Sequence, residues 1–165
     1  MKLIIINGAP GIGKTTIGRL LHNRLSNSAF LDGDDVWKIN PFEVNEKTKS
    51  LVEKNITQVL RNYFEAGYEY VILAWVLHQQ STIDRLINNL DDLRPETHVF
   101  TLVTDEDTLV ARLQADTQTI RNLDTARDRL RQSQLMETTK IDTTGVKPEE
   151  IVKEILGAIV NYPHP

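Results

Sequence analysis

The chain has 165 residues, enough for one domain with a sizeable buried core, and its formal net charge of −4 argues against a nucleic-acid or anionic-membrane surface as a general partner. No stretch approaches the roughly 20 apolar residues of a membrane span. The absence of cysteine excludes disulfides, thiolate chemistry and Cys-ligated zinc and, with an N-terminal apolar run too short for a signal peptide, favours a cytoplasmic protein.

Strand and helix patterns alternate along the chain, without a repeat, a low-complexity tract or a linker. The hydrophobic periodicity predicts strands over residues 2–7, 29–31, 70–76, 98–103 and 138–141. It predicts helices over 15–25, 46–64, 81–90, 123–134 and 148–160, and one more that starts within 104–107 and ends at 114. A capping box at Ser81 opens the helix 81–90. Strands separated by helices indicate parallel βαβ units, so we expect one α/β domain over residues 1–165. In such folds ligands bind at the carboxyl ends of the strands.

The most specific motif lies between the first strand and the first helix. It reads Gly-Ala-Pro-Gly-Ile-Gly-Lys-Thr, the G-x-x-x-x-G-K-[ST] phosphate-binding loop, in the strand-loop-helix context that it requires. Its glycines let backbone N–H groups point at phosphate oxygens, and the helix directs its N-terminal dipole to the same anion. Lys14 is expected to reach the β- and γ-phosphates, and the Thr15 hydroxyl to bind Mg²⁺. The residues expected to bind the nucleoside triphosphate are Gly8, Ala9, Pro10, Gly11, Ile12, Gly13, Lys14, Thr15 and Thr16.

An acidic segment, Asp32-Gly33-Asp34-Asp35, follows the second strand. Phosphoryl transfer needs Mg²⁺ between the β- and γ-phosphates and a group that orients the acceptor hydroxyl, and carboxylates at a strand end can do both. In an extended strand Asp32 and Asp34 would share a face, unless Gly33 bends the chain. A solvated acidic turn that caps the next helix is the alternative. An EF-hand is excluded because Val36 stands where a ligand is needed.

These residues resemble the small P-loop kinases of the nucleoside-monophosphate-kinase-like superfamily, which includes shikimate, gluconate and adenylylsulfate kinases and antibiotic phosphotransferases. The matching positions are the loop 8–15, the segment 31–35, Arg112 and the segment 141–144. The resemblance implies a three-layer P-loop fold, with a five-stranded parallel sheet in the order 2-3-1-4-5 and helices on both faces. It implies ATP and Mg²⁺ as cofactors, with one carboxylate helping to hold the metal and the other contacting the acceptor. We assign Asp32 to the metal and Asp34 to the acceptor.

The resemblance also assigns residues late in the chain. It implies that Arg112 packs near the adenine and that the backbone around Thr143 lines the same site. A short lid, expected over residues 116–122, should supply an arginine that neutralises charge on the transferring phosphoryl group. Relatives often carry a second arginine four residues after the first, where this chain has Asp116, so we assign the catalytic role to Arg121.

The acceptor is expected to bind beside residues 36–66 and the end of the third strand. Candidate contacts are Asp34, Trp37, Phe42, Asn55, Trp75 and His78. Trp37 and Phe42 suit an apolar wall, with packing under the long helix as the alternative. Asn55 lies within the apolar stripe of that helix and needs hydrogen-bond partners, which substrate or nearby backbone can provide. His78 suits an acceptor contact or a satisfied surface position.

The distribution of arginines bears on the acceptor. Residues 25–60 contain no arginine, and none follows the third strand until Arg85. Nucleoside monophosphate kinases clamp the acceptor's phosphate with arginines, so we predict an ATP-dependent kinase that phosphorylates a hydroxyl of a small, uncharged acceptor. The alternatives are a nucleoside monophosphate kinase and a nucleotide-binding regulatory protein without such an acceptor. A GTPase is excluded because the N-K-x-D base-reading motif is missing, and a monomer or a dimer is compatible with the site.

Overall fold

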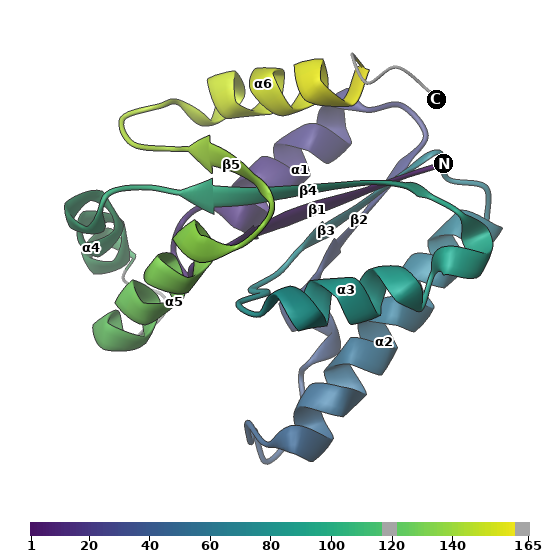
Figure 1. Cartoon of the computed structure of the whole chain (residues 1–165), viewed down its shortest axis with the longest axis horizontal. Helices are drawn as coiled ribbons and strands as arrows, with labels where there is room; N and C mark the ends of the chain where they lie inside the picture. Colours follow the sequence, from purple (N-terminus) through teal and green to yellow (C-terminus); the bar gives the residue numbers. More distant parts are fainter. Residues whose placement is uncertain (117–121, 161–165) are drawn as a thin grey trace.

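Five parallel strands form one sheet in the order β2-β3-β1-β4-β5 in the computed structural model, which describes residues 1–116 and 122–160 (Figure 1). The strands are β1 (Lys2–Gly8), β2 (Ser28–Asp32), β3 (Tyr70–Ala74), β4 (Glu96–Val103) and β5 (Thr139–Asp142). In the register, Ile4 of β1 pairs with Ile72 of β3 on one side and with His98 of β4 on the other. The expected sheet order and parallel topology are confirmed.

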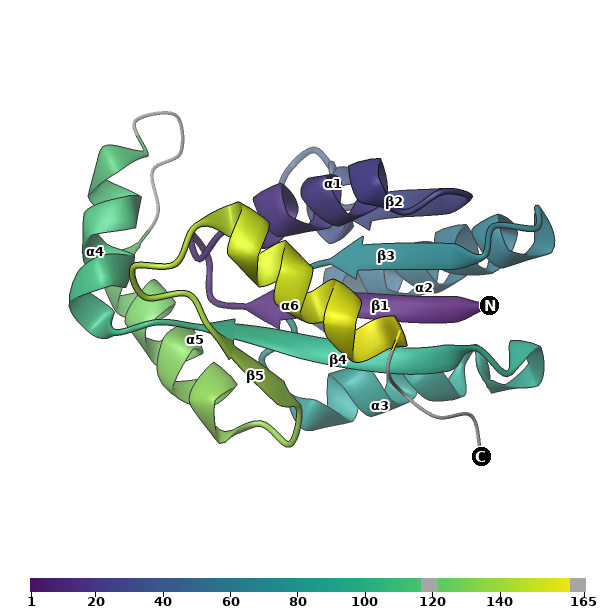
Figure 2. The same ribbon diagram turned by 90° about the horizontal axis from the view of Figure 1, so that it is seen from above.

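Helices cover both faces of this sheet (Figure 2). They are α1 (Lys14–Arg24), α2 (Glu46–Glu65), α3 (Gln80–Asn88), α4 (Glu106–Ala115), α5 (Leu123–Leu135) and α6 (Pro148–Val160), with 3₁₀ turns η1 (Gly33–Val36) and η2 (Asp91–Leu93). In both views α1 and α6 lie over one face of the sheet, α2 and α3 lie over the other, and α4 lies beyond the carboxyl end of β4.

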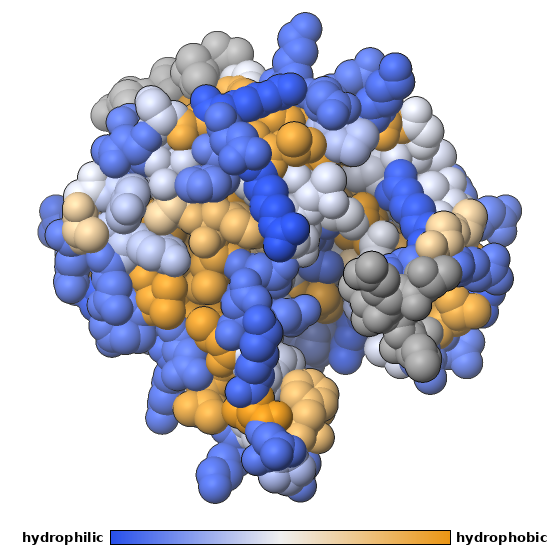
Figure 3. All heavy atoms as spheres, turned by 180° about the vertical axis from the view of Figure 1, so that it is seen from behind, coloured by the Kyte–Doolittle hydropathy of each residue, from blue (hydrophilic) through white to orange (hydrophobic). Residues whose placement is uncertain are grey.

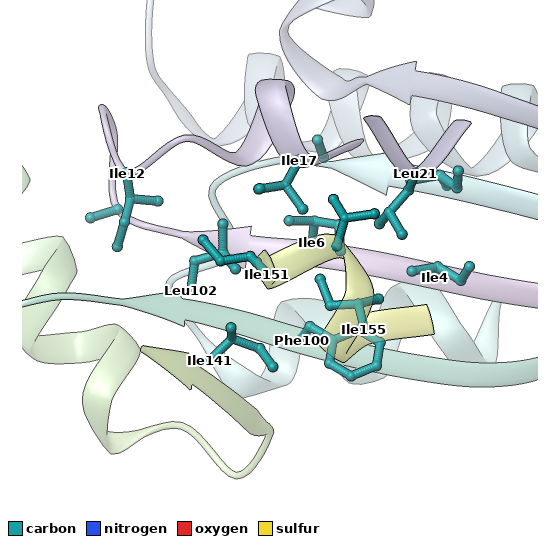
Figure 4. Packing of buried hydrophobic residues seen from close by; sticks show 14 of the residues in the cluster. Ile4, Ile6, Ile12, Ile17, Leu21, Phe100, Leu102, Ile141, Ile151 and Ile155 are labelled. Carbon is teal, nitrogen blue, oxygen red and sulfur yellow. The ribbon is translucent and has the colours of Figure 1, made fainter. Parts of the chain in front are cut away.

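Strand β1 explains why two separate cores form. Its residues Leu3 to Ile6 are all completely buried, and successive side chains point to opposite faces of the sheet. Ile4 and Ile6 pack with residues of α1 and α6, including Ile17 and Ile155 (Figure 4). Leu3 and Ile5 belong to the second core, which α2 and α3 cover. The continuous apolar run is therefore the signature of a central parallel strand.

Two local expectations need correction, and one alternative that the sequence left open is decided. Helix α3 begins at Gln80, and its N-cap residue Gln79 makes no side-chain capping bond, so the capping box expected at Ser81 is wrong. Strand β3 ends at Ala74, two residues early, and the chain then leaves the sheet. The acidic segment is a 3₁₀ turn rather than an extended strand end, and the Asp32 carboxylate caps it by accepting a bond from Asp34 N at 3.1 Å.

A buried asparagine ties the sheet to the segment that follows β3. Asn7 on β1 is completely buried; its Nδ2 donates to Thr101 Oγ1 at 3.2 Å, and its Oδ1 accepts from Leu77 N–H at 2.7 Å. The Thr101 hydroxyl lies 2.6 Å from that of Thr138. This network fixes the backbone of the segment after β3 at the carboxyl edge of the sheet.

Replacing Asn7 by leucine is expected to lower the free energy of unfolding by about 2–4 kcal/mol, because the buried Leu77 N–H would lose its acceptor and the Thr101 hydroxyl would keep only Thr138 as a partner. Urea denaturation measures the change. Asn23→Leu, at an exposed position of α1, is the matched control and should stay within about 0.5 kcal/mol of the parent. Equal stability of the Asn7→Leu and Asn23→Leu proteins would contradict this role.

Candidate functional site

A cleft of about 1270 Å³ opens beyond the carboxyl ends of β1, β2 and β3. Most of the residues singled out from the sequence line it: Pro10, Gly11, Gly13, Lys14, Thr15, Thr16, Asp32, Asp34, Trp37, Phe42, Trp75, His78 and Arg112. Gly8, Ala9, Ile12, Asn55 and Thr143 are not part of its lining. The expected catalytic Arg121 lies outside the described residues, as does the middle of the expected lid, whereas Asp116 lines the cleft.

The phosphate loop is shaped by glycines in left-handed backbone conformations. Gly11 has φ +80°, and Gly13, the N-cap residue of α1, has φ +107° and ψ +12°. No side chain caps this helix start, so its first N–H groups are directed into the loop. The Lys14 ammonium donates to Ala9 O at 2.9 Å across the loop. Helix N–H groups together with a lysine ammonium are an arrangement that suits a phosphate group.

The loop residues outside the lining hold its shape. Ala9 and Ile12 are buried in the core, so only their backbone groups are available to a phosphate. At Gly8 a Cβ would lie 2.8 Å from Leu102 O, and therefore this position needs glycine for the close approach to β4.

A carboxylate and a hydroxyl meet at the mouth of the loop. Thr15 Oγ1 donates to Asp32 Oδ2 at 2.7 Å, which joins the first turn of α1 to the end of β2. Mg²⁺ prefers oxygen ligands and is commonly held by one or two protein groups together with substrate phosphates. The described residues contain no group of three or more His, Cys, Asp or Glu side chains that could hold a metal by themselves. The donor set at Thr15 and Asp32 therefore fits a phosphate-bound Mg²⁺ and not an all-protein metal cage.

Asp34 faces the cleft because η1 turns it there. Its Oδ1 accepts a hydrogen bond from Trp75 Nε1 at 3.2 Å. The turn packs tightly on the same indole, since a Cβ at Gly33 would lie 2.4 Å from Trp75 Cγ. Asp35, by contrast, forms a surface ion pair with Lys38 at 2.7 Å. Of the adjacent aspartates at 34 and 35, only Asp34 lines the cleft.

Aromatic side chains form the wall beside Asp34. The ring centroids of Trp37 and Trp75 are 6.1 Å apart in an edge-on arrangement, and those of Trp37 and Phe42 are 5.6 Å apart. Phe42, Val44 and Leu51 are exposed on the loop before α2 and the start of that helix. Figure 3 shows apolar atoms among charged ones at this lower end of the molecule.

Asn55 has a structural role instead of the expected substrate contact. Its Nδ2 donates to Val36 O at 3.1 Å, so it holds the last residue of η1 against α2. Substrate and nearby backbone were both expected as possible partners of this amide, and the fold provides backbone.

Thr143 likewise serves the fold. It is buried, its N–H and hydroxyl both donate to Val103 O, and its carbonyl accepts from Arg112 Nη2 at 2.7 Å. Arg112 also donates to Ile12 O at 3.3 Å while lining the cleft. The pair joins α4, the phosphate loop and the segment after β5, so Thr143 positions Arg112. Contact between the backbone at Thr143 and a nucleotide stays a prediction.

Charged residues that were not among the predicted site residues also line the cleft. Arg85 of α3 is one of them, although its Nη2 is paired with Glu53 Oε1 of α2 at 3.0 Å. Lys49 and Arg129 are further cations on the wall. The sequence alone did not place them in the cleft, because their positions depend on which faces of α2, α3 and α5 turn towards it.

His78 lines the cleft as expected and is partly buried. Burial lowers its pKa, and the positive charges of Arg129 and Lys49 lower it further. The imidazole is therefore uncharged at neutral pH and can donate or accept a hydrogen bond.

Residues 4–139 match the family model of the AAA domain. The chain belongs to this family. A search of curated protein sequences gave no match. Among solved structures, the AAA-domain chain is similar to a tunicamycin resistance protein from Deinococcus radiodurans, with a TM-score of 0.73 and 24% identity over 99% of this chain and 98% of that one.

Two further structures share the fold. A gluconokinase from Sinorhizobium meliloti 1021 has a TM-score of 0.71 and 16% identity over 96% of this chain and 91% of its own. A sugar kinase from Janibacter sp. HTCC2649 has a TM-score of 0.74 and 12% identity over 99% and 96%. Together with the family match they confirm the P-loop fold that the resemblance implied.

Proposed function

We propose that the protein is an ATP-dependent kinase that transfers the γ-phosphoryl group to a hydroxyl of a small, uncharged acceptor. The observation that carries this proposal is that one cleft holds both halves of a transfer site. The phosphate loop with the Thr15–Asp32 pair forms one half, and Asp34 with its aromatic wall forms the other. A protein that only binds nucleotide needs just the first half.

The residues have complementary roles in this reaction. The loop N–H groups and Lys14 hold the phosphates, and Lys14 exchanges its bond to Ala9 O for phosphate oxygens that gain charge in the transition state. Thr15 and Asp32 would hold Mg²⁺, and the metal would supply positive charge that neutralises the phosphate oxygens. Arg121 of the lid, outside the described residues, is proposed to close over the transferring group.

Asp34 is proposed to be the acceptor-side base. Its carboxylate accepts the hydroxyl proton as the acceptor oxygen bonds to the γ-phosphorus. The bond from that phosphorus to the β–γ bridging oxygen breaks at the same time, and ADP leaves. The bond from Trp75 Nε1 at 3.2 Å orients the carboxylate for this step.

An uncharged acceptor remains the proposal, although Arg85 places one arginine on the cleft wall, where a phosphate of the acceptor could bind it. Arg85 is paired with Glu53 at 3.0 Å and Lys49 with Glu46 at 2.9 Å, so these charges balance one another. The neighbours are named for tunicamycin resistance, gluconate and sugar, and these different names indicate no common acceptor.

Nucleoside monophosphate phosphorylation is the second candidate, because Arg85 lies where it could release Glu53 and bind a phosphate. A monomer or dimer without nucleic-acid partners, in the cytoplasm, remains the prediction for the molecule in solution. Within residues 1–116 and 122–160, no helix has the length and apolar character to cross a membrane.

The test is ADP release from Mg·ATP across a panel of antibiotics, sugars, sugar acids, nucleosides and nucleoside monophosphates. We expect an uncharged alcohol to raise ADP release well above the rate without acceptor. Stimulation by nucleoside monophosphates alone would favour the second candidate. A slow rate that no compound changes would contradict a kinase and favour a nucleotide-binding regulatory protein.

Weakening the metal site gives a separate prediction. Asp32→Asn is expected to raise the Mg²⁺ concentration for half-maximal ADP release by about 10–100-fold, because it removes a negative charge beside the Thr15 hydroxyl. Excess EDTA should abolish turnover in the parent. Asp91→Asn, at an exposed position of η2, is the control and should leave the Mg²⁺ dependence unchanged. An unchanged Mg²⁺ dependence in Asp32→Asn would remove Asp32 from the metal site.

A further inference from the structure

A ladder of aromatic rings leads from the base of the acceptor side to its rim. Trp75 is buried at the base and bonded to Asp34. Trp37 stands edge-on to it at 6.1 Å, and Phe42, which is 63% exposed, continues the series at 5.6 Å. All these side chains line the cleft. A carboxylate suited to a hydroxyl therefore lies directly beside an apolar, ring-lined surface.

Two pairs of charged groups around this ladder are bonded to one another. Arg85 is held by Glu53, and Lys49 by Glu46, while Lys54 adds a further cation to the wall. A sugar can pack its C–H face on an indole, but its many hydroxyls then need polar partners at the rim. These pairs leave Arg85, Lys49 and their two glutamates less available to a polyol, although Ser50 and Lys54 also line this wall.

The indole N–H of Trp37 is an additional clue. Within the described part of the chain, its Nε1 is buried and has no hydrogen-bond partner. Buried polar groups are nearly always satisfied, so this donor suits a ligand atom brought in when Trp37 or Phe42 turns. A heteroatom at the edge of a ligand ring stacked on this ladder can fill that role.

We propose that the acceptor is an uncharged alcohol that carries an aromatic ring, nucleosides included. The ring lies against Trp37 and Phe42, and its hydroxyl reaches Asp34. Ring-on-ring contact adds stabilisation beyond the burial of area, and it selects flat ligands over open-chain polyols. This inference rests on the proposed kinase function, of which it specifies the substrate class.

The chain offers a direct probe of this surface, because its two tryptophans are Trp37 and Trp75. Intrinsic fluorescence of the full chain with Mg²⁺ and a non-hydrolysable ATP analogue would report ligand binding without turnover. Matched ligand pairs isolate the ring: uridine against methyl β-D-ribofuranoside, and 3-phenyl-1,2-propanediol against glycerol. We expect the aromatic member of each pair to bind at least about tenfold more tightly, and equal affinities would overturn the proposal.

A single substitution tests whether the aromatic ladder itself binds the ligand ring. Phe42→Ala changes an exposed side chain, and it should weaken binding of uridine about tenfold while leaving the methyl riboside unchanged. Leu135→Ala, at an apolar side chain that is 84% exposed on α5, is the matched control and should change neither affinity. An unchanged uridine affinity in Phe42→Ala would refute the stacking role.

ADP release with the same compounds distinguishes the two proposals. Turnover with a ring-free polyol and none with aromatic alcohols would refute the substrate class and keep the kinase. Ring-selective binding, with no acceptor that stimulates ADP release, would refute the kinase and keep the aromatic subsite.

Discussion

Replacing Lys14 by methionine is expected to lower kcat for phosphoryl transfer about a thousandfold, which corresponds to about 4 kcal/mol of lost transition-state stabilisation. The loop N–H groups remain in this variant, but the mobile positive charge that can follow the transferring phosphoryl group is removed. Methionine has a similar length and no charge, so the loop should keep its shape. Initial rates of ADP release at saturating acceptor measure the effect.

Lys153→Met is the control for Lys14→Met, because Lys153 is an exposed lysine of α6, away from the cleft lining. It should retain the parental kcat. A Lys14→Met protein that is folded by circular dichroism and turns over at the parental rate would show that Lys14 is not a transfer residue.

Asp34→Asn is expected to lower acceptor-dependent turnover by about a hundred- to ten-thousandfold, the usual range for loss of a general base. The amide oxygen can still accept the bond from Trp75 Nε1, so the turn and the aromatic wall should persist. The slow ATP hydrolysis without acceptor should change much less, because the loop and the metal side are intact. The ratio of the two rates, with and without acceptor, is therefore the informative readout.

The neighbouring aspartate provides the matched control. Asp35→Asn removes the same charge from the same turn, but Asp35 points to the surface and pairs with Lys38. It should leave acceptor-dependent turnover within about twofold of the parent, because exposed ion pairs contribute little. Equal losses in Asp34→Asn and Asp35→Asn would indicate a general effect of charge and would contradict a proton-accepting role for Asp34.

Much of the fold was predictable because its signals are local. The buried run Leu3 to Ile6 defines a central strand, and the alternation of strands and helices restricts the topology to parallel crossovers. The turn at Gly33–Val36 stayed one of two alternatives because its tight packing depends on Trp75, which is distant in sequence. The start of α3 was misplaced because a capping pattern at Ser81 competes with tertiary packing, and packing decides.

In the candidate site, too, local features were predictable and features that depend on tertiary packing were not. The phosphate loop is one continuous segment with its own backbone geometry, so the sequence predicts it well. The partners of Asn55 and Thr143 could not be predicted, because a polar residue in the sequence does not reveal whether its partner is ligand or protein. The Arg85–Glu53 pair joins two helices, and its contribution to the cleft follows only from how they pack.

The most direct test of the central claim follows the γ-phosphoryl group itself. The protein is incubated with Mg²⁺ and ATP labelled in the γ-phosphate, together with the acceptor panel, and labelled organic esters are separated from labelled inorganic phosphate. The kinase proposal predicts that label enters a phosphate ester of an uncharged alcohol, and that Asp34→Asn prevents this. Label recovered only as inorganic phosphate, at a rate independent of every acceptor, would contradict it.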